Sequence, residues 1–120
     1  MSEHQILPLT PLSFQILVAL ADASRHGYGI IKEIEEAQGR AFKSSTGTLY
    51  LAIQRLVKEG LIEEEPAPPP GGDPRRKYYR LTPRGRGTAV AEVDRLAQLL
   101  GVARKKRLVR KGSPEAPLGA

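Results

Sequence analysis

The segment that most constrains the fold is residues 44–61, SSTGTLYLAIQRLVKEGL, because it is amphipathic and carries a boundary signal at each end. Its apolar residues recur at the spacing of one helix face. They are Leu49, Ala52, Ile53, Leu56 and Val57. Ser44 or Ser45 can cap the first turn with a hydroxyl, and Gly60 suits the left-handed position after the last turn. The segment therefore predicts a helix of about 14 residues, which is close to the ordinary length.

The other face of this predicted helix is polar. It carries Thr48, Tyr50, Gln54, Arg55 and Lys58. The first turn has small hydroxyl residues and no acid, so its unpaired N–H groups can approach a phosphate closely. The same pattern also fits a core helix with a solvated face. The segment that follows favours the first interpretation.

Residues 61–82 predict a β-hairpin with a long loop, because short strand candidates flank a tip rich in proline and glycine at residues 66–74. In the second strand, Tyr79 and Leu81 share one face, while Tyr78 and Arg80 share the other. A helix followed directly by a basic hairpin is the winged-helix arrangement. In that arrangement the helix enters a major groove of DNA and the hairpin, or wing, touches the neighbouring backbone.

Residues 10–101 resemble the PadR-type transcriptional regulators. The resemblance rests on HGYG at residues 26–29, GTLY at 47–50, RLVKEGLI at 55–62 and YYRLTPRG at 78–85. It implies a dimeric winged helix that binds DNA, and family members are often released from DNA by a small ligand between the winged domain and the C-terminal helices. Two features depart from the family pattern: Leu51 stands where proline is frequent, and the wing tip is long and rich in proline.

The fold class that these signals predict is mainly α with a small β-hairpin. We expect an N-terminal arm at residues 1–9, a winged helix-turn-helix domain at 10–82, a C-terminal dimerisation helix at 83–101 and a basic, disordered tail at 102–120. Thr10 followed by Pro11, and Thr82 followed by Pro83, are strong helix starts. We expect the first helix to end near Ala23. The second runs from about Gly27 to Gln38, with Gly39 as its stop signal.

Composition excludes several classes of function. The chain has no cysteine, and only His4 and His26 could supply imidazole ligands, so we expect no metal and no cofactor. No nucleotide-binding or nucleophile motif is present, which makes an enzyme the least favoured class. The 120 residues fit one domain, and no apolar run is long enough to cross a bilayer, so we expect a cytoplasmic protein.

The net charge of +6 is unevenly distributed along the chain. Basic residues outnumber acidic ones by five in residues 66–90 and by four in residues 91–120, whereas residues 41–65 are almost neutral. This favours a division of labour in which the wing holds phosphates and the helix reads bases. We expect the acids Glu63, Glu64 and Glu65 on the far side of the wing, or paired across the hairpin with Arg75, Arg76 and Lys77. The residues predicted to contact DNA are Ser44, Ser45, Thr46, Thr48, Tyr50, Gln54, Arg55, Arg75, Arg76, Lys77 and Tyr78.

The last predicted helix carries a narrow apolar seam at spacings of four, three and four residues. The helix either packs on its own domain or pairs with a second copy, and the family resemblance favours the dimer. The predicted dimer contacts are Leu12, Ile16, Ala89, Val93, Leu96 and Leu100.

The sequence thus predicts a homodimeric, sequence-specific regulator of the PadR type, most simply a repressor, that binds an inverted repeat in double-stranded DNA. A small-molecule effector is a further possible partner of unknown identity. The alternative is a winged-helix adaptor whose basic wing binds an acidic protein. Selective binding of one duplex separates the two, because an adaptor would show only weak binding that ignores DNA sequence.

Overall fold

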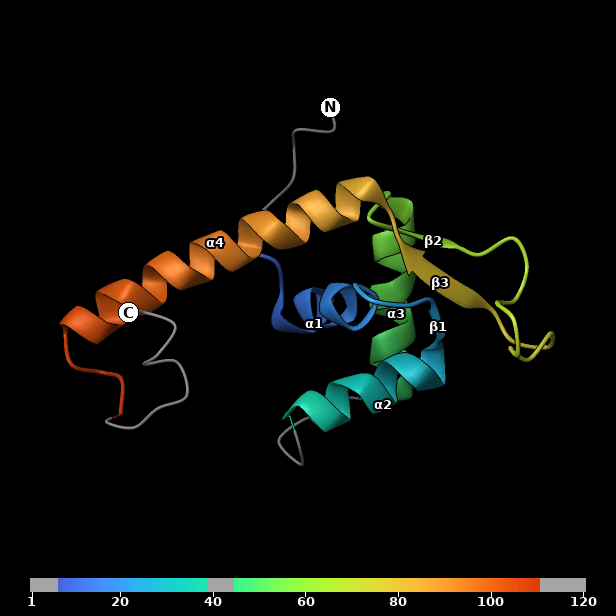
Figure 1. Cartoon of the computed structure of the whole chain (residues 1–120), viewed down its shortest axis with the longest axis horizontal. Coiled ribbons are helices and arrows are strands. Elements are labelled where there is room, and N and C mark those ends of the chain that lie inside the picture. The colour runs from blue at the N-terminus through green and yellow to red at the C-terminus, as the bar shows by residue number, and fades with distance from the viewer. Residues whose placement is uncertain (1–6, 39–44, 111–120) are drawn as a thin grey trace.

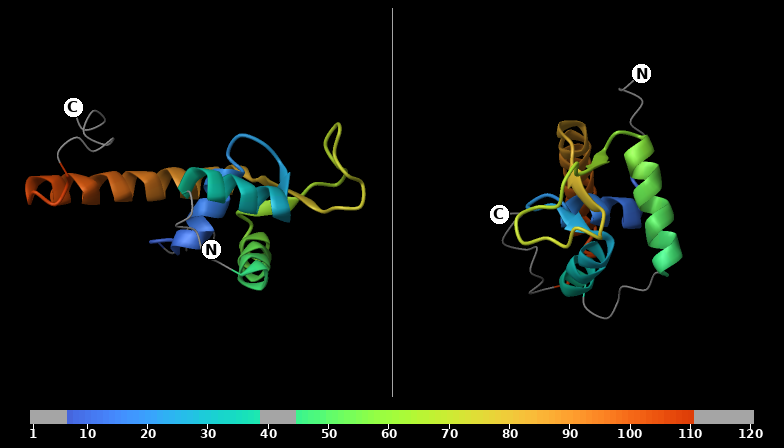
Figure 2. Two further views of the ribbon diagram at one scale, coloured as in Figure 1. Left: turned by 90° about the horizontal axis from the view of Figure 1, so that it is seen from below. Right: turned by 90° about the vertical axis from the view of Figure 1, so that its right-hand side faces the viewer.

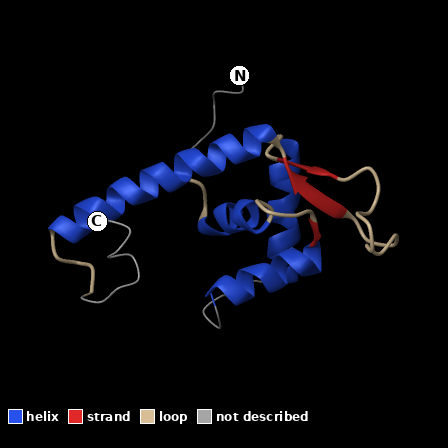
Figure 3. Cartoon of the chain, viewed as in Figure 1, coloured by secondary structure: helices blue, strands red, loops and turns tan. Residues whose placement is uncertain are grey.

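The structure is a computed structural model and describes residues 7–38 and 45–110. Within these residues it has four helices and three short strands (Figures 1 and 3). The elements in chain order are α1 (Pro11–Ala19), β1 (Arg25–His26), α2 (Gly27–Gln38), α3 (Thr46–Lys58), β2 (Ile62–Glu64), β3 (Tyr78–Leu81) and α4 (Pro83–Lys105). The predicted fold class, a mainly helical winged helix, is confirmed.

Three helices begin with the same device, a hydroxyl that accepts a hydrogen bond from the backbone N–H three residues later. Thr10 caps α1 at 3.2 Å, Ser45 caps α3 at 3.0 Å and Thr82 caps α4 at 2.9 Å. These caps confirm the predicted helix starts. Ser44 and Gly39, which the sequence placed at helix boundaries, lie outside the described residues.

The first helix is shorter than predicted, ending at Ala19 rather than near Ala23. The reason lies in two arginines from later in the chain. Arg25 Nε donates to the carbonyl of Ala19 at 2.8 Å, and Arg86 Nη2 donates to the carbonyl of Ala21 at 2.7 Å. Because these side chains bind the carbonyls that a continuing helix would use, the chain turns away there.

The sheet has three strands in the order β1-β3-β2, all antiparallel, where the sequence predicted only the hairpin of β2 and β3. Strand β1 pairs Arg25 with Tyr79 and His26 with Tyr78. Two residues are too few to show the alternation by which a strand is recognised in a sequence. The pairing attaches the start of α2 to the base of the wing.

The core lies between α1, α2, α3 and the sheet. The predicted apolar stripe of α3 is largely confirmed, since Leu49, Ile53 and Leu56 are buried, while Val57 at its edge is exposed. The other fully buried large side chains of the apolar core are Ile16, Leu17, Ile30, Leu61 and Ile62. Each such side chain contributes about 1.5–3 kcal/mol relative to an exposed position, so this small core fixes how α3 is held.

Two glycines set the path from α3 through the wing to α4. Gly60 has a φ of +79°, as its predicted left-handed position requires. At Gly85 an added Cβ would lie 1.9 Å from the carbonyl oxygen of Leu61, so only glycine permits this approach. The hydroxyl of Thr82 also donates to the carbonyl of Gly60 at 2.7 Å. The wing and the start of α4 are therefore tied directly to the end of α3.

Helix α4 extends to Lys105, beyond the predicted end at Gly101. The expectation that a disordered tail begins at residue 102 is therefore wrong for residues 102–105, and residues 111–120 lie outside the described part of the chain. Basic residues in the last turn, Arg104 and Lys105, favour the helix end electrostatically and help it to continue past a glycine. The first half of α4 lies against α1, whereas the second half projects away from the rest of the molecule (Figures 1 and 2).

An ion pair within α4 holds the buried carboxylate of Glu92. The carboxylate of Glu92 is 2% exposed, and both its oxygens accept from Arg95 at 2.8 Å. The Arg95 guanidinium, together with the backbone N–H of Leu9, lowers the pKa of Glu92. The hydrogen bond from the N–H of Leu9 to Glu92 joins the segment before α1 to α4. None of the described helices is long and apolar enough to cross a membrane.

Candidate nucleic-acid interface

The exposed face of α3 is mainly polar, as predicted, although Leu51 and Val57 are also exposed. Thr46, Thr48, Gln54 and Arg55 are all exposed, and none of them is needed by the core. Ser45 is exposed too, but its hydroxyl is engaged, since it accepts from the N–H of Thr48 and donates to Thr48 Oγ1 at 2.8 Å. Among these side chains, Thr48, Gln54 and Arg55 therefore offer groups that can reach bases. Ser44, which was also predicted to bind DNA, lies outside the described residues.

Tyr50 lies on the side of α3 that faces the start of α2. A Cβ added to Gly27 would lie 2.1 Å from the Tyr50 hydroxyl oxygen, so the ring and the α2 backbone are in close contact. Gly27 of the HGYG motif therefore permits the close approach of α2 to α3. The side chain of Tyr50 remains 39% exposed.

Asp73 organises the tip of the wing. One carboxylate oxygen accepts from the N–H of Arg75 at 2.9 Å and from its Nε at 3.2 Å. The Arg75 hydrogen bonds hold the pKa of Asp73 below its usual range. The N–H of Asp73 donates to the hydroxyl of Tyr78 at 2.8 Å. Tyr78 is only 8% exposed, and its hydroxyl is engaged within the wing, so we leave Tyr78 out of the proposed DNA contacts.

The acids of the wing pair with Arg80, and the predicted alternative of pairing with Arg75, Arg76 and Lys77 is wrong. Arg80 Nε donates to Glu63 at 2.6 Å and its Nη1 to Glu65 at 3.1 Å. The strand register explains the choice, because Glu63 and Arg80 are direct cross-strand partners. The hydroxyl of Ser24 also donates to Glu65. Glu63 and Glu65 consequently do not neutralise the cations at residues 75–77.

His26 joins the start of α2 to the wing. Its Nδ1 accepts from the N–H of Gly29 at 3.0 Å and lies 3.2 Å from Nη1 of Arg76. An Nδ1 that accepts requires the neutral ring with its proton on Nε2. Burial, and then the charge of Arg76, lowers the pKa of His26, although Asp73 opposes this shift. The ring also packs edge-on against Tyr78, with 5.2 Å between the ring centroids.

These groups surround a cavity of about 250 Å³ between the start of α2, α3 and β3. Its lining consists of His26, Gly27, Tyr50, Arg76, Lys77 and Tyr79. Tyr50, Arg76 and Lys77 were predicted to contact DNA, but the sequence did not indicate that they line one cavity together with His26. This grouping could not be predicted because it depends on β1, the two-residue strand that pairs His26 with Tyr78.

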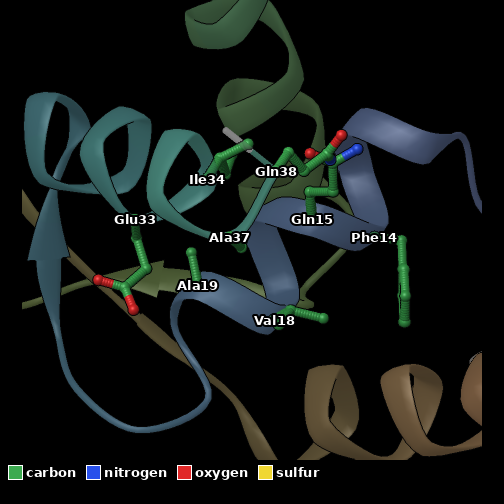
Figure 4. A pocket seen from close by; sticks show the side chains of 8 residues that line it. All are labelled: Phe14, Gln15, Val18, Ala19, Glu33, Ile34, Ala37 and Gln38. Carbon is green, nitrogen blue, oxygen red and sulfur yellow. The ribbon is translucent and has the colours of Figure 1, made fainter. Parts of the chain in front are cut away.

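A second, mainly apolar cavity of about 210 Å³ lies between α1 and α2 (Figure 4). Phe14 and Val18 of α1 and Ile34 of α2 are among the residues that line it, and Phe14 is the only aromatic residue among the described lining residues. The buried Gln15 Oε1 has no hydrogen-bond partner within residues 7–38 and 45–110. The described residues therefore give this cavity no large aromatic surface on which a ligand could stack.

The architecture is that of a winged helix-turn-helix domain with a long helix after the wing. A family model described as the transcriptional regulator PadR-like family matches residues 16–91. The chain belongs to this PadR-like family of transcriptional regulators.

Solved structures share the fold, and one of them is described as a member of the same family. A PadR family transcription regulator from Clostridium difficile is 28% identical, with a TM-score of 0.68 over 80% of this chain and 97% of that one. A transcriptional regulator from Clostridium thermocellum is 30% identical, with a TM-score of 0.67 over 78% of this chain and 87% of that one. A structure described as the complex structure of hsRosR-S4 is 31% identical, with a TM-score of 0.59 over 85% of this chain and 84% of that one.

Curated relatives add less about function. A protein named X from Lysinibacillus sphaericus is 37% identical over 71 residues, and a 37.1 kDa protein of transposon TN4556 from Streptomyces fradiae is 36% identical over 86 residues. Both are described as uncharacterised. The matches cover 59% and 72% of this chain but only 64% and 23% of those two relatives.

Proposed function

We propose that this protein is a homodimeric, sequence-specific DNA-binding regulator that represses transcription by occupying an inverted-repeat operator. One observation carries the proposal: α3 presents an exposed polar face beside a wing whose cations are not paired with Glu63 or Glu65. Such a surface suits double-stranded DNA, because the wing cations can bind its phosphates and the polar side chains of α3 can bind base edges in the major groove.

In this proposal the exposed residues of α3 read bases. Arg55 can bind a guanine with two hydrogen bonds, Gln54 can bind an adenine in the same way, and the methyl of Thr48 can contact a thymine methyl. Thr46 and Ser45, in the first turn, lie where backbone N–H groups meet a phosphate. Tyr50 remains a proposed contact, through the exposed part of its ring.

The dimer rests on the projecting half of α4. Four of its apolar side chains are exposed, at 50% for Val93, 36% for Leu96, 55% for Leu99 and 49% for Val102. Apolar residues exposed together on one helix indicate a partner surface. We assign that surface to a second copy of the chain, because a two-fold dimer pairs the same surface of both subunits. Such a dimer would set two copies of α3 about 34 Å apart on one face of the duplex.

The predicted dimer contacts are revised by burial. Ile16 has no exposed surface and belongs to the core of its own domain, so we leave it out of the proposed interface. Ala89 and Leu12 are partly buried against the same core, which leaves each only an edge for a partner. The proposed contacts are Val93, Leu96, Leu99, Leu100 and Val102.

Selection of bound fragments from a random DNA pool tests the function. We expect one inverted-repeat motif, bound at least ~10³-fold more tightly than random duplex. Enrichment of no motif, with only weak and salt-sensitive binding, would instead support the adaptor that binds an acidic protein.

A further inference from the structure

We propose that the cavity between the start of α2, α3 and β3 holds one phosphate of the DNA backbone, bound by Arg76 and Lys77 and by the hydroxyl of Tyr50. The proposal rests on the DNA-binding function proposed above. It assigns the three wing cations unequal roles, with Arg75 a structural residue and the other two the phosphate ligands.

The three wing cations, Arg75, Arg76 and Lys77, differ in their contacts with Asp73. Arg75 meets this carboxylate twice through its side chain, at 3.2 Å to each oxygen, and once through its N–H. Arg76 lies farther from the same carboxylate, at 3.7 Å from Nε. Lys77 has no ion pair or hydrogen bond with its side chain in the described part of the chain. Arg76 and Lys77, which line the cavity, thus keep most of their charge for a ligand.

Arg76 is held ready for a phosphate by the start of α2. Its Nη1 lies 3.2 Å from Nδ1 of His26, and its guanidinium carbon lies 6.0 Å from the centre of the Tyr28 ring. These contacts leave Nη2 without a partner among residues 7–38 and 45–110. A guanidinium that is already ordered loses less conformational entropy when it binds a phosphate, so the contact is stronger.

The cavity has the size and lining of an anion site. Its volume of about 250 Å³ far exceeds the ~10–15 Å³ that one water molecule requires. Tyr50 and Tyr79, which carry hydroxyl groups, are among its lining residues, and no aspartate or glutamate of residues 7–38 and 45–110 is part of the lining. Burial raises the pKa of Tyr79, which keeps that hydroxyl protonated and able to donate.

The place of the cavity suits a DNA strand. Tyr50 belongs to α3, the proposed reading helix, whereas Arg76 and Lys77 belong to the wing. A strand that passes from the groove occupied by α3 to the wing must run between these elements, and the cavity is lined by residues of both. The cavity is therefore positioned to fix the register of the protein on the duplex, as phosphate contacts generally do.

The test replaces single operator phosphates with uncharged methylphosphonates, one position at a time, and measures binding by wild type, by Arg76→Ala with Lys77→Ala, and by Arg75→Ala. We expect one position in each half-site at which the replacement weakens wild-type binding roughly tenfold or more. The double variant should lose sensitivity at that position and keep it elsewhere. Arg75→Ala should retain the wild-type profile, which makes it the matched control for loss of a wing cation.

Salt dependence gives a second readout of the same site. Loss of one phosphate contact per subunit lowers the slope of log K against log salt by about 0.9 for each half-site. We expect this for the double variant and for Arg76→Gln with Lys77→Gln, whose side chains keep most of their length. Thermal unfolding checks that the variants fold.

Two results would overturn the proposal in distinguishable ways. If the wild type binds its selected operator and the double variant keeps the same methylphosphonate profile, the cavity is not a phosphate site, while the proposed function stands. If the wild type prefers no duplex over random DNA, the proposed function and this inference fail together.

Discussion

Helices α3 and α4 begin with the same kind of cap but expose different kinds of side chains. Each starts with a hydroxyl cap, Ser45 or Thr82, that accepts from the third N–H of the helix. In α3 the apolar residues other than Leu51 and Val57 are buried or partly buried and most exposed residues are polar, whereas the second half of α4 exposes leucine and valine. The two exposed surfaces therefore differ in chemistry, since that of α3 is mainly polar and that of the second half of α4 is apolar.

The apolar end of α4 gives the largest expected effect. Val93→Glu combined with Leu96→Glu should convert a dimer to monomers, because two carboxylates buried at a self-paired surface cost several kcal/mol. Sedimentation measures the change, and the monomers should bind the full operator only weakly. Gln98→Glu, an added carboxylate at another exposed site of the same helix, is the control and should remain dimeric. A wild type that is monomeric at micromolar concentration and still binds its operator tightly would contradict the dimer.

The polar face of α3 should behave in the opposite way, losing specificity without losing the dimer. Thr48→Ser, which removes the methyl, and Tyr50→Leu, which removes the aromatic ring, should each reduce discrimination of the operator by about 1–3 kcal/mol. Gel-shift titrations with the selected and with single-base variant duplexes measure this. If both variants discriminate like the wild type, base reading by these residues is ruled out, and Gln54 and Arg55 become the remaining candidates on α3.

Thr82, the cap of α4, also contacts the end of α3, so its substitution tests the connection between the two helices. Thr82→Ala removes both the hydrogen bond from the N–H of Gly85 and the bond to the carbonyl of Gly60. We expect the free energy of unfolding to fall by about 0.5–2 kcal/mol, while Thr82→Ser, which keeps the hydroxyl, should lose much less. Urea denaturation measures the difference. Equal stability of the two variants would show that the hydroxyl contributes nothing.

Local signals in the sequence predicted much of this architecture. The caps at Thr10, Ser45 and Thr82 and the turn at Gly60 depend on residues within one helical turn, which a sequence displays directly. The features that were missed depend on distant residues. The early end of α1 is imposed by Arg86, and the pairing of Glu63 with Arg80 follows from a strand register that composition does not specify.

The candidate site was predicted in the same uneven way. Arg76 and Lys77 were recognised from charge alone, but the burial of Tyr78 was not, because an aromatic residue within a basic run fits a wet interface as well as a packed one. The contact between His26 and Arg76 was not predicted, because it depends on β1, a strand too short to recognise in the sequence.

His26 gives the smallest expected effect and a sharp test of that contact. Because folding lowers its pKa, the unfolded chain binds the extra proton more readily between the folded pKa and about 6.5. The contribution to stability is therefore complete above pH 6.5 and declines as the pH falls toward the folded value. His26→Asn should remove this dependence while keeping the cap, because the asparagine oxygen can accept from the N–H of Gly29. Denaturation between pH 7.5 and 5 compares the two proteins, and His4, which both retain, cancels. Parallel curves would show that His26 does not have to be neutral to hold α2 and the wing together.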